Sequence, residues 1–357
     1  MRPKRGKAMS ENRTELSQLG EFGLINRLAQ GISTQNHSTV MGIGDDAAVI
    51  NAGDQYGLLA ADMLVEGVHF DLSYVPLQHL GYKAISVNVS DIAAMNGNPE
   101  QVTVSLGLSN RFSVEAIEAL YEGMKAAAKA FHVDIVGGDT TTSKSGLIIS
   151  ISVFGKVEKE KVTYRKGAKV GDILCATGDL GGAFMGLQVM EREKQAFMAN
   201  PDMQPQLENY EYIVQRQLKP IARMDIIHEL AEFGVVPTSM IDISDGLASE
   251  CLHLSTNSGV GIQIYEDKIP IDRQTYETAV EFNLDPITCA LNGGEDYELL
   301  FTIKQEDYDK IEKHEDIHFI GHTQELTKGN SLVTKNNNLV ALKAQGWDHL
   351  NDQKEDN

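Results

Sequence analysis

Hydrophobic and polar positions alternate along the first half of the chain in a pattern that predicts strands and helices in turn. Residues 56–61 form a short apolar run ending at Asp62, which indicates a buried strand. Residues 77–95 place apolar side chains on one helical stripe, and the Gly97 and Pro99 that follow should end that helix. This part of the chain is therefore expected to form a strand and then a long helix.

The remaining segments follow the same alternation. In the first half we expect a helix with Ser113 as its N-cap that ends near residue 130, and strands at 101–108, 133–136 and 147–157. In the second half the pattern predicts strands at 173–176, 261–265, 297–303 and 318–321, and a further strand that ends at Asp242. Helices are expected from 183, within 190–217, and at 221–233 and 247–255.

Such alternation is typical of an α/β (α+β) protein with layered strands and helices in both halves. A chain of 357 residues is longer than one average domain, so two domains are expected. The charged stretch 158–171 indicates the junction between them. We therefore expect a disordered N-terminal extension (residues 1–18) and an N-terminal domain (19–157). A C-terminal domain (165–350) and a polar tail (351–357) should follow.

Charge and cysteine content exclude several functions. The 51 acidic and 31 basic residues give a formal net charge of −20, which argues against binding to nucleic acid or to an anionic membrane surface. No stretch approaches the roughly 20 apolar residues of a membrane-spanning helix. The three cysteines are far apart and fit neither a disulfide framework nor a zinc site, so a cytoplasmic location is the default expectation. A nucleotide is still compatible with this charge, because divalent ions bridge carboxylates and phosphates.

The most informative feature is a set of acids placed in turns of small residues. Converging carboxylates resist ionising together, whereas a hard divalent cation removes that repulsion and accepts oxygen ligands. Flanking glycines let the backbone approach phosphate oxygens closely. A single Gly-Asp pair is also a common turn, but six such motifs together favour a metal–phosphate site. They are Gly42-Ile43-Gly44-Asp45-Asp46, Ala61-Asp62, Val89-Ser90-Asp91, Gly137-Gly138-Asp139-Thr140, Asp242-Ile243-Ser244-Asp245-Gly246 and Gly293-Gly294-Glu295-Asp296.

Other nucleotide-binding motifs are missing or fail in context. The sequence contains no G-x-x-x-x-G-K-[ST] motif and no H-R-D catalytic loop, so neither a P-loop nor a protein kinase is indicated. Residues 42–47 match G-x-G-x-x-A formally. Two acids stand where a pyrophosphate would lie, however, and no clear helix follows, so a dinucleotide site is not indicated either.

Together these motifs closely resemble one family, the thiamine-monophosphate kinases. This family belongs to a superfamily with aminoimidazole ribonucleotide synthetase and selenophosphate synthetase. The resemblance covers residues 19–350 in order. Its further motifs are Gly20-Glu21-Phe22 and the stretches 62–70, 87–95, 165–168, 171–172, 293–299 and 346–349. It implies a two-domain aminoimidazole-ribonucleotide-synthetase-like fold in which each domain is a mixed β-sheet covered by helices.

The resemblance also implies a reaction and a set of roles. ATP would phosphorylate thiamine phosphate to thiamine diphosphate by direct in-line transfer with several Mg²⁺ ions, and the chain would form a homodimer through its N-terminal domain. The expected metal ligands are Asp46, Asp62, Asp91, Asp139, Asp242 and Asp245. The expected ATP-binding residues are Tyr121, Gly138, Asp139, Arg165 and Ser244. Thiamine phosphate would be held by His69, Glu295 and Trp347.

Several alternatives stay open at this point. Ala60 and Ala61 stand where the family often has hydroxyl residues, so metal binding should be weakened or rearranged. Considered singly, His69 also fits a packed histidine, Trp347 a core residue, and Arg165 an ion pair at the domain junction.

Rival functions are another enzyme of the superfamily and a non-catalytic nucleotide- or cation-binding protein. A selenophosphate synthetase would need a reactive residue near its N-terminus, whereas the first cysteine here is Cys175. An aminoimidazole ribonucleotide synthetase also uses ATP, but the motifs at 62–70 and 346–349 favour the thiamine-monophosphate kinases. The full set of acids, with Glu295 on the acceptor side, argues against the non-catalytic protein.

Overall fold

The structure, a computed structural model, describes residues 16, 19–202 and 204–344. The chain forms two compact units. One unit comprises residues 1–35 and 347–357, and its described part contains helix α1 (Gly20–Ala29). The other unit, residues 36–346, contains both β-sheets.

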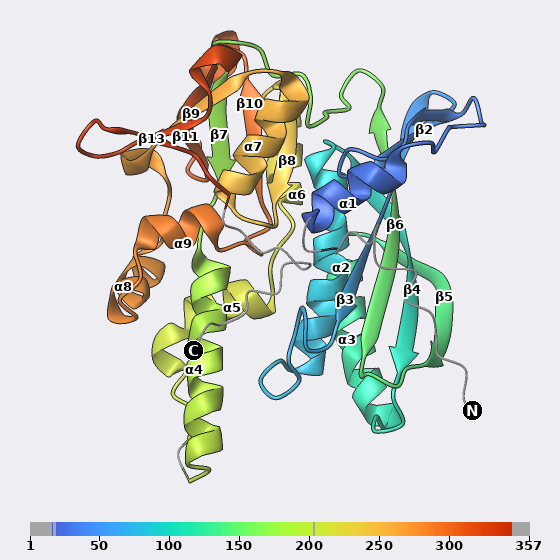
Figure 1. The fold of residues 1–357 in the computed structure, drawn as a ribbon. Helices are drawn as coiled ribbons and strands as arrows, with labels where there is room; N and C mark the ends of the chain where they lie inside the picture. The colour runs from blue at the N-terminus through green and yellow to red at the C-terminus, as the bar shows by residue number, and fades with distance from the viewer. Residues whose placement is uncertain (1–15, 17–18, 203, 345–357) are drawn as a thin grey trace, which may run out of the picture. The chain divides into compact units, whose positions relative to one another are not determined.

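The first half of the larger unit forms a mixed six-stranded sheet with the order β1-β2-β3-β6-β4-β5 (Figure 1). Only β4 and β5 pair in parallel; the other neighbouring strands are antiparallel. Helix α2 (Leu77–Ala94) packs against this sheet, and helix α3 (Val114–Ala130) packs against α2. The strands are β1 (Thr39–Met41), β2 (Ala48–Ala52), β3 (Gln55–Val65), β4 (Asn98–Leu108), β5 (Asp134–Thr142) and β6 (Ile148–Glu158).

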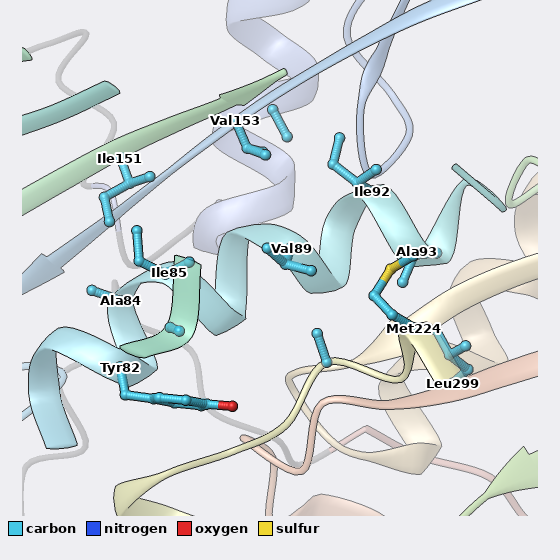
Figure 2. Packing of buried hydrophobic residues seen from close by; sticks show 14 of the residues in the cluster. Tyr82, Ala84, Ile85, Val89, Ile92, Ala93, Ile151, Val153, Met224 and Leu299 are labelled. Atoms are coloured by element: carbon cyan, nitrogen blue, oxygen red, sulfur yellow. The ribbon is translucent and has the colours of Figure 1, made fainter. Parts of the chain in front are cut away.

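Helix α2 is buried on nearly every side. Figure 2 shows Ile85 and Ile92 of α2 near Ile151 and Val153, which are buried residues of β6. Its contact with α3 is very close, because a Cβ added to Gly81 would lie 2.0 Å from the Leu120 carbonyl oxygen. Both helices therefore lie close enough to the sheet and to each other to build one core.

The second half forms a mixed seven-stranded sheet with the order β13-β12-β9-β11-β7-β10-β8. Strands β12 and β9 pair in parallel, and helix α7 (Leu247–Ser258) packs on β8, β9 and β10. The strands are β7 (Ile173–Thr177), β8 (Ser239–Ile243), β9 (Gly261–Tyr265), β10 (Glu298–Ile303), β11 (Ile317–Gln324), β12 (Ser331–Val333) and β13 (Leu339–Ala341). The other α-helices are α4 (Gly182–Ala199), α5 (Glu211–Leu218), α6 (Met224–Glu232), α8 (Arg273–Glu281), α9 (Pro286–Asn292) and α10 (Tyr308–Ile311).

These two sheets confirm the expected fold class. The Ser113 cap is confirmed too, since its side chain accepts a hydrogen bond from the Ala116 amide at 3.3 Å. Strand β3, however, does not end before Asp62 but continues to Val65, because it pairs with β6 along its whole length. The sequence pattern also missed strands β1, β2, β12 and β13 and helices α1, α8, α9 and α10.

The expected domain limits remain predictions. All strands of the first sheet fall between residues 39 and 158, and those of the second between 173 and 341. The N-terminal residues 1–15 and the tail 351–357 lie outside the described residues. Over the part of the chain that the structure describes, no helix is both long and apolar enough to cross a membrane.

Candidate metal and phosphate site

Three carboxylates from distant parts of the sequence meet in the folded chain. Asp46 lies just before β2, Asp91 lies near the end of α2, and Asp242 lies in β8. One carboxylate oxygen from each lies within 4.8 Å of the others. Asp242 and Asp46 are 4% and 9% exposed, and Asp91 is partly buried. We call these three residues the acidic cluster.

Burial makes ionisation of the acidic cluster unfavourable. Loss of hydration, with the nearby Asp46 charge, raises the pKa of Asp242 to about 7. Loss of hydration raises the pKa of Asp91 well above its usual value, and the charges of Asp62, Asp242 and Asp46 add to this effect. The pKa of Asp46 is also raised by burial, although Arg165 opposes the change. When these carboxyl groups lose their protons, their negative charges repel one another, and a bound cation relieves that repulsion.

Arg165 and Ser90 fix two of these carboxylates. The Arg165 side chain donates to Asp46 Oδ1 from Nε at 3.1 Å and from Nη2 at 2.5 Å. The Arg165 amide donates to the Asp45 carboxylate, whose pKa burial raises to about 7. The Ser90 hydroxyl donates to Asp242 Oδ2 at 2.6 Å. Arg165 therefore forms an ion pair at the junction, as the simpler alternative supposed, but its partner belongs to the acidic cluster.

The donor atoms of the acidic cluster suit a hard divalent cation. Asp46 Oδ2 is buried and has no hydrogen-bond partner among the described residues. Carboxylate oxygens bind Mg²⁺ at about 2.0–2.1 Å and Ca²⁺ at 2.3–2.6 Å, so oxygens within 4.8 Å of one another can share one ion. An unpartnered buried carboxylate oxygen beside two other acids fits such an ion better than it fits a closed ion pair.

Two more predicted ligands flank the acidic cluster. The Asp62 amide donates to Asn88 Oδ1 at 3.1 Å, and the Asp62 charge raises the pKa of both Asp91 and Asp242. Asp245 follows β8, and its amide donates to Glu250 Oε1 at 2.9 Å. Glu250 was not predicted; it is buried in α7, and burial together with the Asp245 charge raises its pKa well above the usual value. It lies within α7 and outside the acidic motifs of the sequence, so nothing in the sequence indicated it.

The glycine-rich stretch on β5 lies away from the acidic cluster. Asp62 faces Ile151 of β6, Ile151 faces Val104 of β4, and Val104 faces Gly138 of β5. Three strand spacings separate Asp62 from Gly138, or about 14 Å. Asp139 is exposed on the same edge strand. A single chain therefore does not bring Asp139 to the acidic cluster, and its metal role stays a prediction.

Gly138 has a structural requirement of its own. Its φ is +152°, and an added Cβ would lie 1.7 Å from the Val104 carbonyl oxygen. The pairing of β4 with β5 shifts register just before it, between Val102 and Thr103. Only glycine permits this close approach of the two strands.

Tyr121 lines an open cavity of about 540 Å³ between α3 and the end of β4. The other lining residues include Leu108, Phe112, Ile117 and Lys125, so the walls are mostly apolar with a few polar groups. This composition is typical of pockets for small molecules. Thr142, at the end of β5, pairs with Leu108, so the strand that carries Gly138 runs to the border of this cavity.

The predicted acceptor residues are only partly described. Glu295 lies in the turn before β10, with its amide donating to the Ser244 carbonyl at 2.6 Å. His69 is partly buried, and its Nδ1 accepts a hydrogen bond from the Val65 amide at 3.1 Å. Trp347 lies outside the described residues. Ser244 thus joins the turn of Glu295 to the strand of Asp242, which places this turn beside the acidic cluster.

Comparison with known proteins finds relatives in sequence and in structure. A family described as "AIR synthase related protein, N-terminal domain" matches residues 44–157. The thiamine-monophosphate kinase of Bacillus subtilis (strain 168) is 34% identical over 341 residues, which cover 93% of this chain and 100% of that protein. The thiamine-monophosphate kinase of Aquifex aeolicus (strain VF5) is 37% identical, with 82% of this chain and 88% of that protein covered.

A solved structure described as "AaThiL complexed with AMPPCP and TMP" has a similar fold. Its TM-score is 0.80 at 33% identity, and the match covers 95% of this chain and 100% of that chain. These similarities extend over both sheets and confirm the resemblance seen in the sequence motifs. The chain therefore belongs to the thiamine-monophosphate kinase family, a family of phosphotransferases.

Proposed function

We propose that this protein transfers the γ-phosphoryl group of ATP directly, in line, to thiamine phosphate, giving thiamine diphosphate and ADP. The observation that carries the proposal is the acidic cluster of Asp46, Asp91 and Asp242, found in a chain of this family. Phosphoryl transfer depends mainly on alignment and on neutralising the charge of the phosphate oxygens. Here the acceptor is itself a phosphate, so the site must overcome repulsion between two anions.

Mg²⁺ ions, several per site, would supply the positive charge that brings the two phosphates together. The acidic cluster would hold them, with Asp62 and Asp245 at its border and Asp139 on β5. For this the carboxylates must lose their protons, and the raised pKa values of Asp91 and Asp242 make that loss depend on the ion. Arg165 keeps Asp46 in place and leaves Oδ2 of that residue for the ion.

The ATP base takes the cavity lined by Tyr121, and the phosphates extend from there past Gly138 and Asp139. The position of Leu108, which lines the cavity and pairs with Thr142 of β5, supports this path. Arg165 and Ser244 then lie toward the transferred phosphoryl group, beside the acidic cluster. On the acceptor side, Glu295, His69 and Trp347 hold thiamine phosphate; an aromatic ring and a carboxylate suit its thiazolium cation.

We also propose a homodimer formed through the N-terminal sheet. Strand β5 is a nine-residue edge strand that is exposed along almost its whole length, and Val136 on it is 59% exposed. Leu59 and Met63 of β3 are 44% and 54% exposed in the same sheet. A long uncovered edge and an apolar sheet face are unfavourable in an isolated subunit. A second copy would also supply Gly138 and Asp139, which one chain leaves about 14 Å from Asp62.

The three cysteines support the proposed cytoplasmic location. They are buried and form no disulfide, and thiols are kept reduced in that compartment.

A coupled assay of ADP release tests the proposed reaction. With ATP and Mg²⁺, addition of thiamine phosphate should give ADP and thiamine diphosphate in equal amounts, and formylglycinamidine ribonucleotide should give none. ADP formed only with the ribonucleotide would indicate an aminoimidazole ribonucleotide synthetase. Binding of ATP without ADP release under either condition would indicate the non-catalytic alternative.

A further inference from the structure

Helix α2 carries a buried lysine that the sequence motifs did not single out. Lys83 is 3% exposed, so its ammonium group must find partners within the protein. Its Nζ donates to Glu295 Oε2 at 2.9 Å and to the Gln217 carbonyl oxygen at 3.2 Å. The pair Lys83–Glu295 thereby connects a helix of the first half with the turn before β10 in the second half.

The Glu295 carboxylate is held through only one of its oxygens. Oε2 accepts from Lys83 Nζ and from Gln217 Nε2, the latter at 2.5 Å. Oε1 has no hydrogen-bond partner among the described residues, and the side chain remains 28% exposed. A carboxylate fixed at one oxygen and unpartnered at the other is arranged to receive a ligand.

Two further observations indicate a ligand at this turn. Gln217 is only 6% exposed, and its buried side-chain oxygen lacks a hydrogen-bond partner in the described part of the chain. The backbone of Glu295 has φ +58°, and Tyr297 has φ +52°. Such left-handed conformations cost energy in residues other than glycine and are concentrated at functional sites.

Lys83 belongs to a polar stripe on α2. Lys83, Ser86 and Ser90 are spaced by three and four residues, so they share one face of the helix. Each contacts a different segment of the second half: Lys83 contacts Glu295, Ser86 accepts from the Ala222 amide at 3.0 Å, and Ser90 donates to Asp242. Seven residues of helix separate Lys83 from Ser90, about 10 Å.

We infer that Lys83 is a positioning residue for the acceptor site: it holds the Glu295 carboxylate at a fixed distance from the acidic cluster through the rigid helix α2. This inference rests on the proposed function, because it assigns to Glu295 the binding of thiamine phosphate. Lys83 acts through Glu295 and does not itself touch the phosphates. Without the lysine, Oε2 of Glu295 keeps only the hydrogen bond from Gln217, so the orientation of the carboxylate and of its Oε1 is no longer fixed.

A double-mutant cycle tests this coupling. Lys83→Met should raise the KM for thiamine phosphate by about 10- to 100-fold while the KM for ATP changes less than about 3-fold, the size expected for loss of one buried charged hydrogen bond. Glu295→Gln should have a similar effect. The variant with both changes should be no worse than Glu295→Gln alone, because Lys83 has nothing left to position.

Three further variants complete the experiment. Lys161→Met removes an exposed lysine and should leave both KM values unchanged. Lys83→Arg keeps the charge and should recover part of the affinity for thiamine phosphate. If Lys83→Met does not fold, as judged by its melting curve, Gln217→Met removes the second donor to Glu295 and should raise the same KM by a smaller factor.

Additive effects of Lys83→Met and Glu295→Gln, or equal rises in both KM values, would overturn the inference. A parent enzyme that releases no ADP with thiamine phosphate would instead contradict the proposed function. In that case, the coupling between Lys83 and Glu295 is measured from the dissociation constants of thiamine phosphate for the parent and the variants.

Discussion

At the scale of single residues, burial of the acidic cluster opposes the negative charge of its carboxylates. Asp46, Asp91 and Asp242 lose hydration and face one another within 4.8 Å. Desolvation opposes ionisation of each, and the Arg165 guanidinium offsets only part of this at Asp46. A divalent ion supplies the charge that Arg165 does not, so the cluster is stabilised when it binds the ion and strained when it is fully ionised without one.

Removing one charge from the acidic cluster should separate stability from activity. Asp242→Asn and Asp91→Asn should each lower turnover with ATP and thiamine phosphate at least about 100-fold, because each removes an anionic ligand from the ion. Both variants should be as stable as the parent, or more so, without Mg²⁺, since a buried like-charge repulsion is lost. Steady-state kinetics and melting curves measure the two effects.

Asp54→Asn is the matched control, because this exposed turn residue lies outside the acidic cluster. It should retain turnover within about 2-fold of the parent. Near-normal turnover of both cluster variants at saturating Mg²⁺ would show that these residues do not bind the catalytic ion.

The effect of Mg²⁺ on stability should increase with pH. The pKa of Asp242 rises from 3.8 to about 7 in the folded chain, so between about pH 4 and 7 the folded state holds a proton that the unfolded state releases. The free energy of unfolding without metal therefore falls as pH rises through that window, and levels off above it. Mg²⁺ binds the deprotonated carboxylates, so it should restore this loss chiefly near pH 8.

Differential scanning fluorimetry at pH 5.5 and pH 8 measures this dependence. The rise in Tm with saturating Mg²⁺ should be at least about 3 °C larger at pH 8. Equal shifts at the two pH values would be inconsistent with protonated carboxyl groups in the metal-free protein. Asp242→Asn should reduce the difference between the two pH values.

At the scale of elements, α2 organises the site. It packs on the first sheet, carries Asp91 and presents Lys83 and Ser90 to the second half of the chain. The helix and its limits could be predicted from its apolar stripe and from Gly97 and Pro99. Its burial on almost all sides could not, because that depends on α3 and on segments more than a hundred residues away.

The close contact of α2 with α3 should tolerate no added methyl group. A Cβ on Gly123 would lie 1.8 Å from the Gln78 carbonyl oxygen, so Gly123→Ala should lower the free energy of unfolding by about 2 kcal/mol or more. Helix propensity alone would favour alanine by about 1 kcal/mol, so the sign of the change decides between packing and propensity.

Denaturant unfolding measures this change. Glu122→Ala, at the adjacent exposed position of the same helix, is the control and should change stability by less than about 0.5 kcal/mol. A stabilised Gly123→Ala variant would mean that the two helices lie further apart than described here.

At the scale of the whole molecule, the residue pattern predicted most of the strands, and the family resemblance implied the two mixed sheets. Their pairing could not be predicted, since residues far apart in sequence meet there: β3 pairs with β6, and β7 lies between β10 and β11. The same limit applies to the site. The sequence placed the acids in turns of small residues, but Asp62 lies in β3, Asp91 in α2 and Asp242 in β8. Which acids converge depends on the strand pairing, which separates Asp139 from Asp62. Lys83 and Glu250 lie inside helices and carry no motif.

The proposed homodimer predicts that charge on the exposed edge strand weakens association. Val136→Lys places an ammonium group on β5, where lysine is unfavourable for strand-to-strand contact, and should raise the dimer dissociation constant at least about 10-fold. Turnover should fall with it at low protein concentration, because Asp139 would come from the second copy.

Sedimentation equilibrium measures the association. Val280→Lys on α8, which alters a comparably exposed valine of the second half, should leave it unchanged. A parent protein that is monomeric yet fully active would remove both the homodimer and the contribution of the second copy.

The most direct measurement is a crystal structure with a non-hydrolysable ATP analogue, thiamine phosphate and Mn²⁺ in place of Mg²⁺. Anomalous scattering should place Mn²⁺ within about 2.5 Å of carboxylate oxygens of Asp91 and Asp242, between the terminal phosphate of the nucleotide and the phosphate of the acceptor. Anomalous peaks that touch only the nucleotide, with these side chains bound to no ion, would contradict the account.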